Sequence, residues 1–171
     1  MAIEHALLGL LAESPRHGYE LTKEFAPGTI LSDIVHLESG MLYAHIKKLE
    51  LRGWLASAVE PQESRPARRV LSITPLGRDE LDRWLREPVD KTRDVRLEFL
   101  LKLYFARTLA SDLLPHLLHE QRTICEAHVD SLTRQIAAER DDFRRLVLQM
   151  RLAQNEALVT WLREATGLVN R

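Results

Sequence analysis

The stretch that decides the fold runs from residue 39 to residue 53 and reads SGMLYAHIKKLELRG. Its apolar residues Leu42, Ile46 and Leu49 are spaced i, i+4 and i+7, which predicts a helix with one face in a core. Ser39 is a predicted N-cap, and the helix is expected to end near Arg52, before a closing glycine. Tyr43 and Lys47 fall on a different face of the same helix. The pattern therefore predicts a helix with a buried side and a separate side for contacts.

The residues after this helix have the character of a β-hairpin. Two short apolar stretches, 54–59 and 70–74, flank the polar segment EPQESRPARR at 60–69, and such an arrangement predicts two strands joined by a charged loop. Thr74-Pro75 then predicts the start of a further helix, because proline is favoured at the first helical position. That helix should carry Leu76, Leu81, Trp84 and Leu85 as apolar residues and stop at Pro88.

The residues before it read as short helices. Residues 2–12 and 17–25 each have a helical apolar pattern, separated by Ser14-Pro15, and 30–37 is ambiguous between a short helix and a connection. Three short helices within the first 53 residues, followed by a hairpin, predict a winged helix-turn-helix unit over residues 1–88.

The second half, residues 89–171, has a different sequence pattern from the first and is predicted to be a helical dimerisation domain. Residues 89–96 read as a linker, and 97–168 read as helix throughout, with a turn near 138–142 that makes the long helices antiparallel. An apolar seam recurs at spacings close to 3 and 4, as in coiled coils. Its members are Leu132, Ile136, Phe143, Leu146, Met150, Ala153 and Ala157. The predicted fold class is thus mostly α with a small β-hairpin wing.

The amino-acid composition limits the classes of protein to which the chain could belong. The chain has 171 residues, 45% apolar and 29% charged, with a net charge of −1. No apolar run approaches the roughly 20 residues of a membrane span, no secretory signal is visible, and a single cysteine excludes an intrachain disulfide, so a cytoplasmic location is expected. Because the overall charge is near zero, nucleic-acid binding would need a local patch. Residues 43–69 hold six Lys/Arg against three Glu.

Four motifs in order resemble the PadR family of transcription regulators. They are HGYEL at 17–21, SGMLYAHIKKLE at 39–50, RPARR at 65–69 followed by ITPLG at 73–77, and RLEFLLKLY at 96–104. In the family these correspond to the second helix, the recognition helix, the wing with the entry to the next helix, and the start of the helical dimerisation extension. The chain departs from the family pattern at Ser64, often glycine, at Ala44, often proline, and at Val70-Leu71, where an aromatic is common.

The resemblance implies a repressor that binds a pseudo-palindromic operator in double-stranded DNA as a homodimer and is released by a small-molecule effector. The recognition helix, 39–52, would enter the major groove, and the wing, 60–69, would lie on the backbone or in the minor groove. The residues expected to contact DNA are Ser39, Gly40, Met41, Tyr43, Lys47, Lys48, Arg65, Arg68 and Arg69, with one of Arg68 and Arg69 facing DNA because they alternate along a strand.

An effector is expected near Phe99, Leu103 and Trp161, between the helical extension and the winged domain. No cofactor and no metal are predicted, because the pairs His116/His119 and Cys125/His128 would face opposite sides of a helix. The sequence has no glycine-rich phosphate loop, nucleophile elbow or zinc-ligand motif, so no enzyme is expected. The alternative is a helical adaptor that binds a partner protein, not DNA.

Overall fold

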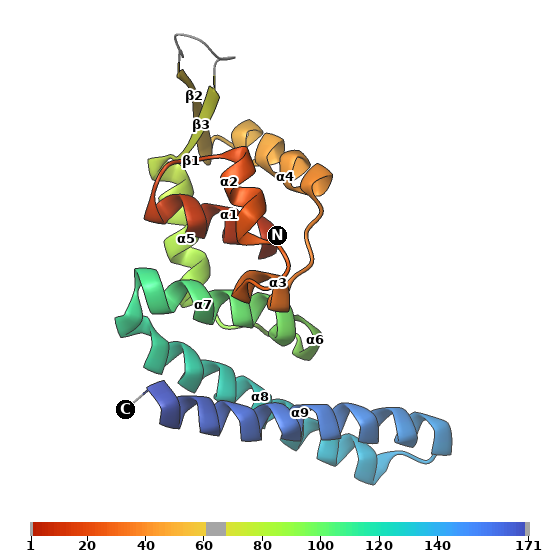
Figure 1. The fold of residues 1–171 in the computed structure, drawn as a ribbon. Coiled ribbons are helices and arrows are strands. Elements are labelled where there is room, and N and C mark those ends of the chain that lie inside the picture. Colours follow the sequence, from red (N-terminus) through yellow and green to blue (C-terminus); the bar gives the residue numbers. More distant parts are fainter. Residues whose placement is uncertain (1, 61–67, 170–171) are drawn as a thin grey trace.

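The structure, a computed structural model, describes residues 2–60 and 68–169. Its first part is a winged helix-turn-helix (Figure 1). The elements follow in the order α1 (Ala2–Glu13), β1 (Arg16–His17), α2 (Gly18–Glu24), α3 (Ile30–Ile34), α4 (Ser39–Leu51), β2 (Leu55–Glu60), β3 (Arg68–Ile73) and α5 (Pro75–Arg86). The three strands form an antiparallel sheet in the order β1-β3-β2. The predicted winged fold is confirmed.

Helix α4 buries the predicted stripe: Leu42, Ile46 and Leu49 are all buried in the core. One detail at the start of the helix differs from prediction. The N-cap is Glu38, whose side chain makes no capping hydrogen bond, so Ser39 is already the first helical residue. At the other end Gly53 has a φ of 70°, a left-handed conformation that glycine adopts without steric cost, and it turns the chain into β2.

The hairpin β2–β3 pairs Leu55 with Ile73 at its base, and the loop that joins the strands, 61–67, lies outside the described residues. Thr74 then caps α5 by accepting a hydrogen bond from the amide of Gly77, with Pro75 at the start of the helix as predicted. Of the four apolar residues expected on α5, Leu81, Trp84 and Leu85 are buried, whereas Leu76 is 56% exposed.

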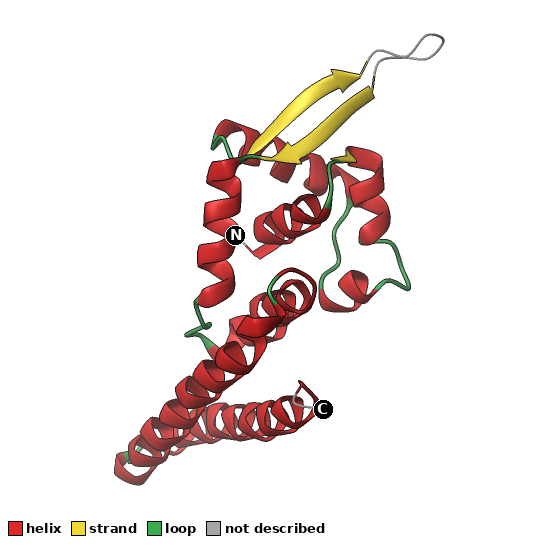
Figure 2. Ribbon diagram, turned by 90° about the vertical axis from the view of Figure 1, so that its left-hand side faces the viewer, coloured by secondary structure: helices red, strands yellow, loops and turns green. Residues whose placement is uncertain are grey.

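The second part is helical but not continuous, and the predicted linker over 89–96 is helical from Thr92 onward. It comprises α6 (Thr92–Asp94), the π-helix η1 (Val95–Phe99), α7 (Leu100–Leu109), the 3₁₀ turn η2 (Ser111–Leu113), α8 (Leu114–Ala138) and α9 (Asp142–Val169). The predicted turn near 138–142 is confirmed, and α8 and α9 lie side by side and antiparallel (Figures 1 and 2). The break at Ala110, whose φ of −156° and ψ of 60° are not helical, was not predicted.

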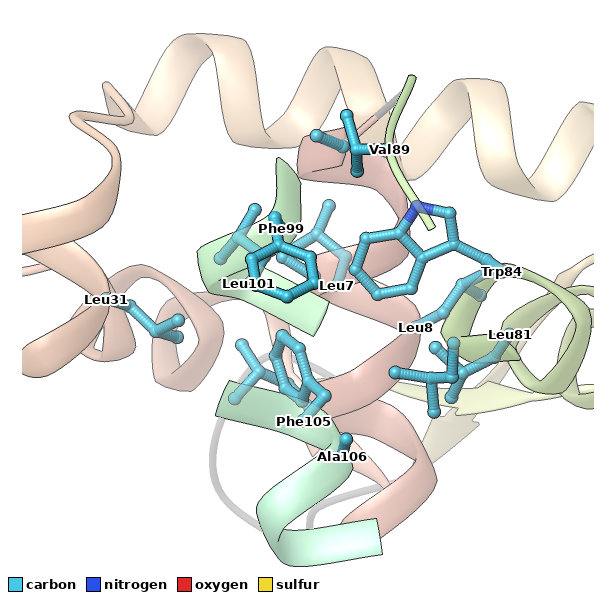
Figure 3. Packing of buried hydrophobic residues seen from close by; sticks show 14 of the residues in the cluster. Leu7, Leu8, Leu31, Leu81, Trp84, Val89, Phe99, Leu101, Phe105 and Ala106 are labelled. Carbon is cyan, nitrogen blue, oxygen red and sulfur yellow. The ribbon is translucent and has the colours of Figure 1, made fainter. Parts of the chain in front are cut away.

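Helix α7 joins the two parts through one core. Phe99 at the end of η1, together with Phe105 and Ala106 of α7, packs in one cluster with Leu7 of α1 and Trp84 of α5 (Figure 3). The supposed linker contributes to the same core, since Val89 and Val95 are both buried. The boundary at residue 88 therefore falls within a continuous apolar core.

Most of the predicted seam lies on the surface of this chain. Phe143, Leu146 and Met150 are 73%, 60% and 64% exposed, and Ala153 and Ala157 are exposed on the same face of α9. The opposite face, which carries Leu148, Val159 and Leu162, is the buried one. Of the seam, only Leu132 is fully buried. No helix among the described residues is long and apolar enough to cross a membrane.

Candidate DNA-binding surface

The outward face of α4 is built from small and polar side chains. Gly40, Ala44 and Lys47 follow one another along this face, and all three are exposed. A methyl group added at Gly40 would meet no atom within 4 Å, so nothing inside the chain requires glycine there. Ser39 is exposed, and Met41 and Tyr43 are 50% and 53% exposed. The outward face of α4 thus carries small side chains at two positions, which would let the helix backbone come close to base edges in a groove.

Tyr43 connects the HGYEL stretch with the recognition helix. A Cβ at Gly18 would lie 2.8 Å from Cε1 and 3.0 Å from the hydroxyl of Tyr43, so the tyrosine ring occupies the space left by the missing side chain. Around it lies an open, largely apolar hollow of about 470 Å³, lined by His17, Gly18, Tyr19, Tyr43, Ile46, Arg69 and Leu71. Gly18 of the HGYEL motif therefore leaves the space in which the ring of Tyr43 lies.

Lys48 points away from the outward face, toward α1. Its ammonium lies 2.6 Å from Oε1 of Glu4, and Arg52 reaches Oε2 of the same carboxylate at 2.9 Å. Glu4 is fully buried. Burial raises the pKa of the Glu4 carboxyl, but the hydrogen bond from Lys48, the positive charges nearby and the hydrogen bond with His45 together hold that pKa below its ordinary value. Sequence reasoning missed Glu4 altogether.

The wing is tied to α4 by Arg69. Its guanidinium donates to Glu50 at 2.6 Å and to the hydroxyl of Ser57 at 2.8 Å, while the side chain remains 58% exposed. The backbone of Arg68, at the start of β3, pairs with that of Glu60, at the end of β2. Arg65 lies outside the described residues. Of the three predicted wing arginines, the structure thus brings Arg69 beside the recognition helix.

Comparison with known proteins supplies the family. The model of the transcriptional regulator PadR-like family matches residues 7–83, and that of the virulence activator alpha C-terminal region matches 95–170. Residues 7–83 therefore belong to the PadR-like family. Its members are transcriptional regulators, which agrees with the prediction that the chain is not an enzyme.

Two curated proteins are similar to this PadR-like chain. The negative transcriptional regulator PadR of Bacillus subtilis is 26% identical over 99% of this chain and 98% of its own length. The probable transcriptional regulator Rv1176c of Mycobacterium tuberculosis is 32% identical over 56% of this chain and 50% of its own. The crystal structure of B. subtilis PadR in complex with operator DNA superposes with a TM-score of 0.50 at 24% identity, covering 99% of both chains, and thus shares the fold.

The joint between the two parts of this PadR-like chain holds buried polar groups. Lys102 of α7 is fully buried and donates to the carbonyl oxygens of Trp84 and, at 2.7 Å, of Glu87, at the C-terminal end of α5. Burial lowers the pKa of Lys102 to about 8. Gln121 of α8 makes two 2.8 Å hydrogen bonds with the backbone of Val89. A lysine inside the apolar run LEFLLKLYFA was the one sequence signal for this joint.

The three predicted effector residues lie in this same region. The rings of Phe99 and Trp161 are 6.3 Å apart and meet edge to face, and Phe99 is fully buried. Leu103 lines a separate apolar hollow of about 260 Å³ between α3 and the helical part, beside Ile34 and Tyr104. The structure therefore brings Phe99 and Trp161 together and leaves Leu103 as the member that faces open space. Among the described residues, no group of three His, Cys, Asp or Glu side chains could hold a metal ion.

Proposed function

We propose that this PadR-like regulator is a sequence-specific repressor that binds a pseudo-palindromic operator as a homodimer. The observation that carries the proposal is the two-sided helix α4. Its apolar stripe is buried, and its opposite face combines exposed Gly40 and Ala44 with Lys47. Small residues let the helix backbone approach base edges closely, and a lysine one turn further on reaches a phosphate.

In this proposal the first turn of α4 and the wing fix the register on DNA. Ser39 and Tyr43 donate hydroxyl hydrogen bonds to phosphates, and Met41 contacts the groove wall. Arg69, exposed beside α4, together with Arg65 or Arg68, contacts the backbone or the adjacent minor groove. The B. subtilis relative is named a negative transcriptional regulator, which supports repression as the outcome.

A homodimer would cover the exposed stripe of α9. Phe143, Leu146 and Met150 are each more than half exposed and recur at the spacing of a coiled-coil seam. Apolar groups in such a row favour burial against a partner, and a second copy offers the same row. A two-fold dimer then matches a pseudo-palindromic site, with recognition helices about 34–36 Å apart.

The effector is proposed to bind between the winged and helical parts. The hollow beside Leu103 borders α3 on one side and α7 and α8 on the other, and Phe99 and Trp161 contact each other within the helical part. A ligand that favours one arrangement of this joint would change the separation of the two recognition helices and so the affinity for DNA.

Selection of bound duplexes from a random DNA pool tests the DNA-binding part, because it returns the site, its symmetry and the half-site spacing together. A symmetric site bound with strong salt dependence is expected, and a chain that enriches no sequence contradicts the proposal and favours the adaptor. Sedimentation tests the dimer: Leu146→Asp should give monomers, whereas Leu76→Asp, a leucine of similar exposure on α5, should not. The dimer proposal fails if both variants sediment like the parent.

A further inference from the structure

Glu4 holds one side of the recognition helix. This carboxylate belongs to α1, is fully buried, and faces three cationic or titratable side chains, two of α4 and one of its C-cap residue. Lys48 lies at 2.6 Å, Arg52 at 2.9 Å and the Nδ1 atom of His45 at 3.3 Å from its oxygens. Positions 45, 48 and 52 are three and four residues apart and share one side of the helix. A single buried carboxylate therefore contacts three positions along one side of the helix.

The pairing is stronger than a surface ion pair. Exposed lysine–carboxylate pairs contribute little to stability, but a fully buried carboxylate left without partners is strongly destabilising. The Arg52 guanidinium is held a second time, because it lies 4.9 Å from the centre of the Trp54 ring. Lys48 and Arg52 are thus restrained although their side chains are 51% and 34% exposed.

The neighbouring lysine is in a different situation. Lys47 is exposed on the outward face, and no ion pair to it is found among the described residues. Two adjacent lysines of the same helix therefore differ in whether they are free to contact a phosphate. Lys47 can exchange water for a phosphate, while Lys48 would first have to leave a buried carboxylate.

We propose that Glu4 is a specificity-determining residue for DNA binding. By holding Lys48 and Arg52, it keeps two cations from phosphate contacts and fixes the rotation of α4 about its axis. Binding then depends less on backbone charge and more on the contacts of the outward face. The inference rests on the proposed role of α4 in DNA recognition, and it replaces the predicted DNA contact of Lys48 by a structural one.

The salt dependence of binding to a random-sequence duplex tests this inference, because the logarithm of affinity falls with the logarithm of salt by about 0.9 for each phosphate neutralised. Glu4→Gln should steepen this slope by about 1 to 2, as the two freed cations reach phosphates. Adding Lys48→Gln and Arg52→Gln to it should return the slope to the parent value. Glu13→Gln, on the same helix but paired with Arg16 away from α4, is the matched control and should leave the slope unchanged.

A second comparison remains informative if Glu4→Gln does not fold. In the otherwise unaltered protein, Lys47→Gln should flatten the slope by about 0.9, and Lys48→Gln by less than half as much. The inference is overturned if folded Glu4→Gln keeps the parent slope, or if Lys48→Gln flattens it as much as Lys47→Gln. A parent protein that binds no duplex at all would instead refute the proposed function.

Discussion

Substituting Gly18 by alanine should impair DNA binding through Tyr43. The new Cβ would lie 2.8 Å from Cε1 and 3.0 Å from the hydroxyl of the tyrosine. Carbon atoms pack at about 3.5 Å or more, so the ring must move by roughly 0.7 Å. Tyr43 is half exposed and can turn into solvent, so the cost to the fold is small. The unfolding free energy should change by less than about 1 kcal/mol, since alanine also gains helix propensity over glycine.

The expected loss of affinity is larger than the loss of stability. An O–H···O hydrogen bond spans about 2.5–3.0 Å, so a displacement of 0.7 Å breaks it. Hydrogen bonds to charged groups contribute about 1.5–3 kcal/mol, which corresponds to a roughly 10- to 100-fold weaker half-site. Gel shifts or fluorescence anisotropy with a selected operator, alongside urea unfolding, measure both quantities.

A double-mutant cycle decides whether Tyr43 transmits the effect. If Gly18→Ala acts only by displacing the ring, then Gly18→Ala combined with Tyr43→Ala should bind like Tyr43→Ala alone. The reasoning is refuted if Gly18→Ala binds operator like the parent, or if the losses from the two substitutions multiply.

Three further outcomes are expected. Gly9→Ala should lower the unfolding free energy by about 1–2 kcal/mol, because its Cβ would lie 2.4 Å from the buried Phe105 ring and the cost of overpacking exceeds the gain in helix propensity. Thermal melting at fixed protein concentration measures this loss. A loss that Phe105→Leu does not relieve would contradict the reasoning. Gly40→Ala, with open space around it, should keep or raise the melting midpoint yet weaken operator binding by about threefold or more, ~0.6 kcal/mol, and unchanged affinity would count against a close approach to DNA. Between pH 8 and 10 Lys102 keeps its proton in the unfolded chain but has released it in the folded protein. The unfolding free energy should therefore rise with pH by about 2–3 kcal/mol relative to that of Lys102→Met. Parallel pH profiles of the unfolding free energy in the two proteins would disprove this.

The sequence by itself determined the elements whose signals are local. Leu42, Ile46 and Leu49 mark one face of α4 because a helix repeats every 3.6 residues, and Thr74-Pro75 starts α5 because capping involves atoms within one turn. The turn between α8 and α9 was also placed correctly, although no glycine or proline marks it. The order of these elements was enough to predict a winged fold and to select Tyr43 and Lys47 as contact candidates.

Which residues are buried, and where the helices are interrupted, depended on contacts with residues far away in the chain. Leu76 has the residue type of a core position, but no element covers it. Val89 and Val95 looked like linker residues and are buried, because α7 and α8 fold back over them. The helix break at Ala110 carries no glycine, and it arises where α7 leaves the core and α8 begins.

Only the tertiary structure decided how the candidate surface is held. The contact of Gly18 with Tyr43 and the pairing of Glu4 with Lys48 join residues 25 and 44 positions apart, and no periodicity within one helix encodes such pairs. Lys47 and Lys48 are indistinguishable as adjacent letters. They differ because a rotation of about 100° per residue turns one toward solvent and the other toward a buried carboxylate on another helix.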